Sequence, residues 1–146
     1  MILVFRKYRF IFATLIFAAV LLVIIIGLYS IDNATNRMVT DYIESLGWQI
    51  EKSPIEISHL TIPNDFDAVF DTYNSIQISS GFNLASFRGK SVSRYSYKVL
   101  NHKRSDDTDV IASVLVYDSR IIAGDISSTE ENGFMHGITE TANIKQ

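Results

Sequence analysis

The sequence contains no cysteine. This absence excludes disulfide bonds, thiolate zinc sites and thiol catalysis. Secreted eukaryotic domains of this size often carry disulfides, so the composition favours a bacterium, especially one with a single membrane. It also excludes a lipid attached to a cysteine near the N-terminus.

The chain also lacks the short motifs of common enzymes. It has no G-x-S-x-G nucleophile elbow, phosphate loop, dinucleotide fingerprint or calcium loop. Its three histidines form neither H-x-x-x-H nor H-E-x-x-H, whereas zinc needs three or four converging donors. We therefore predict no cofactor, no metal and no catalytic residue, and we favour a protein that is not an enzyme.

Charge is absent from residues 10–29, which read FIFATLIFAAVLLVIIIGLY. A helix rises about 1.5 Å per residue, so about 20 residues reach roughly 30 Å, the thickness of a bilayer core. A cleaved signal peptide has a shorter apolar region and a small-x-small site, which this run lacks. The pattern predicts a transmembrane signal anchor at 10–29.

The charges around this run predict its orientation. Arg6, Lys7 and Arg9 precede it, and the positive-inside rule then places residues 1–9 in the cytoplasm. The remainder becomes an extracytoplasmic domain of a single-pass cell-membrane protein. None of the 16 acidic residues precedes the run, so the remainder has a net charge of −6. This acidity argues against nucleic acid as a partner.

Hydrophobic periodicity predicts one α+β domain over residues 37–138, after a short linker at 30–36 and before a frayed tail at 139–146. Within it, the patterns predict the order helix, strand, helix, strand, strand, strand. The segments are 33–46, 55–62, 64–81, 90–101, 109–118 and 120–128. Three consecutive strands favour an antiparallel meander with the helices packed on one face, in two layers.

Individual residues predict where some elements begin, end or bend. Gly47 fits the C-cap of the first domain helix, where a positive φ is common. Asn64 or Asp65 fits the N-cap of the second helix. Alternation slips at Ser58 and His59, which predicts a bulge there.

Basic side chains gather near the second predicted strand. They are Arg88, Lys90, Arg94 and Lys98. One interpretation is a stripe that binds anionic wall polymers or phosphates. The simpler interpretation is the solvated face of an edge strand, where lysine blocks unwanted pairing. Tyr95 and Tyr97 alternate with these residues and are predicted to enter the core.

Two further residues are candidates for a ligand site. Asp125 is unusual because apolar strand residues surround it, although the alternation favours an outward or edge position. His136 lies in EENGFMHGI and could work with Asp125 in a small hydrolase or metal enzyme. Alternatively this segment closes the domain, with Phe134 and Ile138 as apolar anchors. His102, in a polar loop, is expected to be solvated.

Several motifs together resemble a known family. They are YIESLGW, TIPNDFDAVFDTYNSIQ, GFNL, FRGKSVSRYSYKV, VLVYDSRIIAGDI and GFMHGI. The combination resembles an uncharacterised family of short membrane-anchored proteins of Firmicutes, the DUF4830 type, across residues 41–138. Where relatives often carry G-G-D, this chain has Ala123, Gly124 and Asp125. The resemblance implies a one-helix anchor and an extracytoplasmic domain, but no activity, substrate or site residue.

These observations lead to one main hypothesis and two alternatives. The main hypothesis is a membrane-anchored, non-enzymatic module that binds a partner at the bacterial cell surface. The first alternative is a binder of anionic wall polymers through the basic strand face. The second is the small hydrolase or metal enzyme that uses His136 and Asp125.

Overall fold

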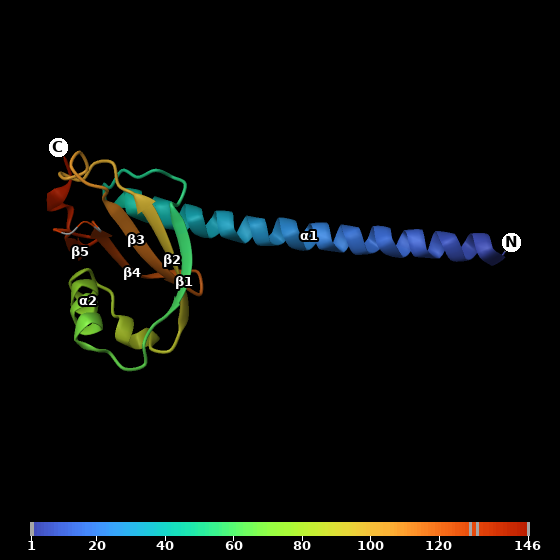
Figure 1. Cartoon of the computed structure of the whole chain (residues 1–146), viewed down its shortest axis with the longest axis horizontal. Helices are drawn as coiled ribbons and strands as arrows, with labels where there is room; N and C mark the ends of the chain where they lie inside the picture. The colour runs from blue at the N-terminus through green and yellow to red at the C-terminus, as the bar shows by residue number, and fades with distance from the viewer. Residues whose placement is uncertain (1, 129, 131, 146) are drawn as a thin grey trace. The chain divides into compact units, whose positions relative to one another are not determined.

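The fold is that of a computed structural model of the chain (Figure 1). It describes residues 2–128, 130 and 132–145, with side chains at 14–26 and from residue 33 onward. The chain divides into two units, Met1–Thr35 and Asn36–Gln146. Helix α1 (Ile2–Ser45) includes residues of both units, so the predicted linker at 30–36 is helical.

The first unit contains the predicted membrane anchor. Among the described residues, no helix has an apolar stretch long enough to cross a membrane. The predicted span is only partly covered by that result, because the side chains of residues 10–13 and 27–29 lie outside the described set.

The second unit is built on a five-stranded antiparallel sheet with its strands in sequence order. The strands are β1 (Glu56–Thr61), β2 (Ser91–Lys98), β3 (Ile111–Tyr117), β4 (Arg120–Ser127) and β5 (Met135–Gly137). Between β1 and β2 lie α2 (Ala68–Ser79) and the 3₁₀ helix η1 (Leu84–Phe87), and η2 (Thr141–Asn143) follows β5. The predicted α+β class is confirmed. The predicted order differs because β5, η1 and η2 are too short to show periodicity.

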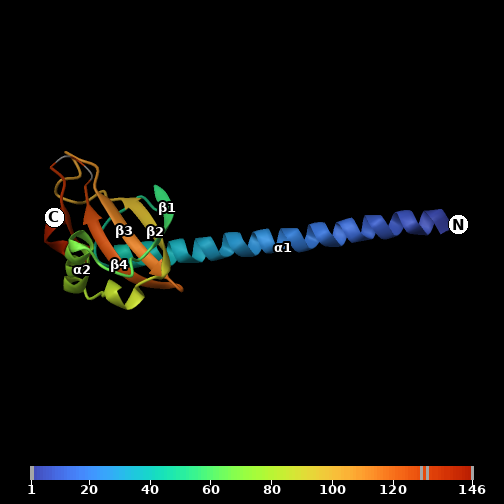
Figure 2. The ribbon, with the colours of Figure 1, turned by 60° about the horizontal axis from the view of Figure 1, so that its bottom comes forward.

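The sheet is covered on both faces, so the prediction of helices on one face in two layers is wrong. On one face, here called the α1 face, Val39 and Ile43 at the end of α1 pack with Tyr97, Val114 and Ile126. The other face, here called the α2 face, packs against α2 and η1, and its buried residues form a second cluster. Figures 1 and 2 both show α2 beside the strands at the β4–β5 side. Sequence periodicity identified both helices but carried no information about which face each would cover.

Several local predictions can be checked directly. Gly47 has φ +92°, as expected of a helix C-cap, and Tyr97 is fully buried. The N-cap of α2 is Asp67, whose carboxylate accepts from the Phe70 amide at 2.8 Å, and is neither of the two predicted residues. The pairing of β1 with β2 is regular, and the sheet irregularity lies instead between Leu115 and Val116.

The tail predicted to be frayed contacts the loop after β2. Ile144 bridges to His102, and the Lys145 amide donates to the Asn101 carbonyl at 2.7 Å. The Lys145 ammonium also lies 2.7 Å from the Asp106 carboxylate. These contacts order the loop and the chain end together.

Candidate functional site

A polar row crosses the α2 face of the sheet. Strand pairing places Glu56 opposite Ser96, Ser96 opposite Ser113, Ser113 opposite Asp125, and Asp125 opposite Gly137. Directly paired residues of antiparallel strands point to the same face. The row therefore has a carboxylate on β1, two small hydroxyls in the centre and a second carboxylate on β4.

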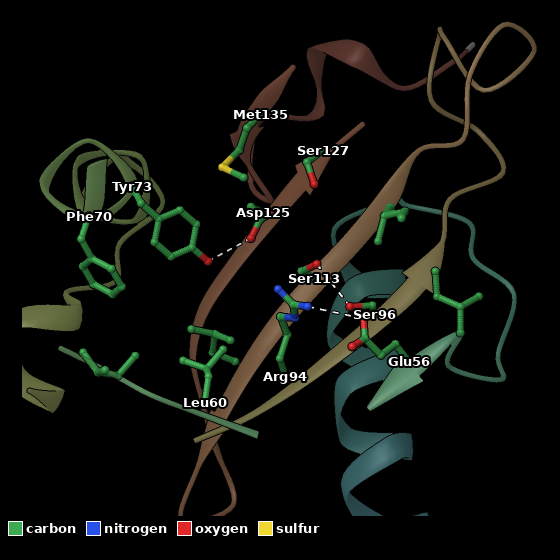
Figure 3. Close-up of a pocket in the computed structure, with 14 residues that line it drawn as sticks. Glu56, Leu60, Phe70, Tyr73, Arg94, Ser96, Ser113, Asp125, Ser127 and Met135 are labelled. Carbon is green, nitrogen blue, oxygen red and sulfur yellow. Dashed lines mark hydrogen bonds and ion pairs between the residues drawn. The ribbon is translucent and has the colours of Figure 1, made fainter. Parts of the chain in front are cut away.

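This row forms the floor of a cavity of about 350 Å³, here called the sheet pocket. Figure 3 shows it, with the side chains of α2 opposite the strands. The lining residues are Ile55, Glu56, Leu60, Ile62, Phe70, Tyr73, Arg94, Ser96, Ile111, Ser113, Leu115, Asp125, Ser127 and Met135. The volume falls in the range of small-molecule sites, and such sites combine apolar walls with a few convergent polar groups.

Asp125 is a buried carboxyl group whose pKa is shifted by the pocket. Its exposed fraction is only 3%, and the Tyr73 hydroxyl donates to its Oδ2 at 3.0 Å. Burial raises the pKa of Asp125 from 3.8 to about 6, while hydrogen bonds from Tyr73 and Ser127 and the charge of Arg94 oppose this shift. Burial and the neighbouring carboxylate likewise raise the pKa of Tyr73, so its hydroxyl stays protonated. A carboxylate with a shifted pKa in a pocket is a frequent property of functional sites.

Arg94 lies between the two carboxylates of the row. Its Nη2 is 3.4 Å from Glu56 Oε2, which is a long and partly exposed ion pair. Its Nε is closed to solvent and has no hydrogen-bond partner among the described residues. The Ser96 and Ser113 hydroxyls beside it are 3.4 Å apart. A buried donor without an acceptor costs free energy, so a ligand that supplies one is favoured.

Polar contacts join α2 to strand β4 and to η1. The buried side chain of Gln77 accepts from the Gly124 amide at 2.8 Å, and Asn74 accepts from the Leu84 amide at 2.8 Å. Gly137 also permits a close approach, because a Cβ there would lie 2.0 Å from Ser80 Oγ. These contacts hold Tyr73 in reach of Asp125.

The structure brings together two of the six predicted ligand residues. Arg94 and Asp125 line the same pocket. Lys98 pairs with Asp109 at 2.9 Å, Arg88 stacks over the ring of Phe66 at 4.4 Å, and Lys90 is exposed. None of these three lines the sheet pocket, and the expectation that Asp125 faces outward is wrong.

His136 lies on the opposite face of the sheet from Asp125. It pairs with Ile126, and consecutive strand residues point to opposite faces. Its ring packs with Trp48, Phe134 and His102. The expectation that His102 is solvated is wrong, since only 3% of it is exposed. His136 and Asp125 therefore do not share a site.

No group of three or more potential metal-ligating side chains occurs within the described part of the chain. The arrangement of His102 and His136 is also unsuitable for binding a metal ion. The Arg104 amide donates to His102 Nδ1 at 3.1 Å, which leaves the proton of neutral His102 on Nε2. That Nε2 lies 3.5 Å from His136 Nε2 and is the donor of the pair rather than a free ligand.

Sequence reasoning missed most of the pocket. Tyr73 was not among the candidate residues, and neither were Glu56, Ser96 and Ser113. The alternation within each strand shows that these residues share a face, but the register that makes them neighbours depends on long-range pairing. The one usable signal was a carboxylate inside an apolar strand.

The fold and the pocket define a small α+β domain with a ligand-sized cavity on one sheet face, which has apolar walls and a polar floor. The chain belongs to the family described as Domain of unknown function (DUF4830), whose model matches residues 42–126. That match includes every polar residue of the pocket except Ser127. Searches among curated proteins and among solved structures found no match.

Proposed function

We propose that the protein is a membrane-anchored binding module whose small ligand occupies the sheet pocket. The observation that carries this proposal is the placement of buried Asp125 beside Tyr73 and the unsatisfied Arg94 Nε in one cavity. Burying such polar and charged groups destabilises the folded state unless partners compensate them. A bound ligand can provide these partners, so such groups are useful in a binding site.

The predicted anchor is supported by the composition and exposure of α1. Large apolar side chains between Leu15 and Ile26 are exposed by 48–72%. A continuous apolar surface of this kind is unfavourable in water and favourable in a bilayer. With the basic residues before it, this supports a cell-membrane location with the domain outside the cytoplasm.

The anchor can be tested in a bacterial host. The full chain should remain in the membrane fraction after a carbonate wash, and a chain that lacks residues 1–35 should not. Protease added outside spheroplasts should remove the domain if it is extracytoplasmic. Release of the full chain by carbonate would contradict the anchor, and protection from protease would contradict the orientation.

The pocket can be tested by ligand-observed NMR with a mixed set of small amines, acids, sugars and dipeptide amides. At least one class should bind the full chain in detergent micelles. Ser113→Leu fills the floor of the pocket and should abolish that binding. The same change at the exposed Ser91 is the matched control and should leave it intact.

Three results would overturn this function. The first is the absence of any binder in the whole set. The second is equal binding to Ser113→Leu and to the unchanged protein, which would place the ligand elsewhere. Chemical turnover of a bound compound would instead make the protein an enzyme, contrary to the proposed non-enzymatic role.

A further inference from the structure

The charges of the sheet pocket define what a ligand must supply. Its charged lining residues are Glu56, Arg94 and Asp125. When both carboxylates are ionised, the pocket carries a net charge of −1. Because buried charges need compensation, the ligand that completes this set carries one positive charge.

The positive charge belongs beside Asp125. This carboxylate is the more buried of the two acids, and its present partner Tyr73 is a neutral donor. Glu56 lies at the edge strand, is half exposed, and already pairs with Arg94. A cation gains most where the opposite charge is least solvated, since screening there is weakest.

The ligand must also bring a hydrogen-bond acceptor. Arg94 Nε needs one, and no described residue provides it. The acceptor must be neutral. A carboxylate on the ligand would be repelled by Glu56 and Asp125, and this repulsion would offset the attraction of the ammonium to Asp125. A carbonyl oxygen meets both conditions.

The remaining lining is apolar. Leu60, Phe70, Leu115 and Met135 surround the polar row, and the small side chains of the row leave its centre open. Figure 3 shows Phe70, Leu60 and Met135 around the polar groups. The pocket is therefore suited to a ligand that combines an ammonium, a nearby carbonyl and an apolar side chain.

We propose that the sheet pocket binds the free amino terminus of a peptide whose first residue is apolar. This inference rests on the proposed function. The α-ammonium lies against Asp125, the first carbonyl accepts from the Arg94 guanidinium, and the first side chain packs with Leu60 and Phe70. A free amino acid carries an additional carboxylate and binds more weakly for the reason given above.

The test uses leucyl-alanine amide as the probe and the full chain in detergent micelles, followed by NMR titration. Acetylation of the probe's amino group removes its charge and should weaken binding roughly tenfold or more, as expected for a charge-assisted contact. Free leucine should also bind more weakly than the probe. Binding of the probe should weaken as the pH falls through about 6 and level off near the affinity of the acetylated probe, because protonated Asp125 no longer attracts the ammonium.

Two variants assign the contacts. Asp125→Asn preserves the shape of the pocket and should reproduce the loss seen on acetylation, with the acetylated and free probes then binding alike. Asp107→Asn is the matched control, since this exposed loop carboxylate lies outside the pocket and its change should leave affinity unaltered.

The outcomes separate this inference from the function on which it rests. Equal binding of the free and acetylated probes, or unchanged affinity in Asp125→Asn, overturns the amino-terminus proposal. The amino-terminus proposal is also overturned if the amide probe does not bind but a sugar or acid does. If Ser113→Leu abolishes that binding, the pocket remains a binding site. Absence of every binder overturns both.

Discussion

The two faces of the sheet are built from alternate residues of the same strands. One face is a packed core whose buried polar groups are paired, whereas the other contains a pocket with buried charged groups. On the α1 face, Trp48 is 1% exposed and its indole donates to the Ile138 carbonyl at 2.7 Å. Tyr97 is buried there and donates to Asn36 at 2.7 Å. On the α2 face, Arg94 Nε has no described partner and Asp125 is buried with a raised pKa.

This difference separates the residues that stabilise the fold from those that line the pocket. The neighbours Ile126 and Asp125 point to opposite faces, the first into an apolar core and the second into a pocket. A strand between two layers can therefore stabilise the fold with one set of residues and bind a ligand with the other. Substitutions on each face should have correspondingly different effects.

The largest effect is expected from Ile126→Ala. Ile126 is fully buried, and removing its side chain leaves a cavity in the α1 face. We expect a loss of about 2–5 kcal/mol in the free energy of unfolding, measured by urea denaturation followed by circular dichroism. Met135→Ala on the α2 face is the comparison, since Met135 is 47% exposed and should cost much less. Equal losses would remove the contrast between the faces.

Asp125→Asn should change how stability depends on pH. The folded pKa of Asp125 is raised from 3.8 to about 6, so its contribution is complete below pH 3.8 and is lost as pH rises through 6. The cost of the carboxylate grows between these limits and reaches about 3 kcal/mol above pH 6, a penalty that the neutral amide avoids. The difference between variant and parent unfolding free energies should therefore grow in favour of the variant from pH 4 to pH 8. A constant difference would mean that the carboxylate is solvated.

His102 should make stability depend on pH in the opposite direction. Burial, followed by the charges of His136, Arg104, Lys103 and Lys145, lowers the pKa of His102. Its contribution to stability is present above pH 6.5 and is lost as pH falls through the lowered value. His102→Gln should abolish this acid-side loss, measured as the pH dependence of the unfolding midpoint. Retention of the full loss would assign it to other groups.

The tautomers of His102 and His136 can be measured as well. His136 Nδ1 faces the Gly137 carbonyl at 3.0 Å, and because a carbonyl only accepts, this nitrogen must carry the proton. His102 Nδ1 accepts from the Arg104 amide, so His102 carries its proton on Nε2. Nitrogen NMR at pH 8 should report these two different tautomers. The same tautomer in both rings would contradict the described contact.

The smallest effect is expected from the basic residues outside the pocket. Lys90 is exposed and Lys98 forms an ion pair with Asp109 that is open to solvent. The double change Lys90→Gln and Lys98→Gln should alter the free energy of unfolding by less than about 0.5–1 kcal/mol. Retention on immobilised lipoteichoic acid at low salt should also change little. A large, salt-sensitive loss of retention would instead support the alternative in which these basic residues bind anionic wall polymers.

The sequence by itself determined the α+β class, the two main helices and four of the five strands, because local periodicity encodes these elements. It also placed Gly47 at a helix end, Tyr97 in the core and two of the pocket residues among its candidates. Tertiary structure decided which face each helix covers, and it moved Asp125 and His102 from expected exposure to burial. It also aligned Glu56, Ser96, Ser113 and Asp125 in one row across four strands. Such a row depends on strand register, which is set by contacts between distant residues and leaves no local pattern in the chain.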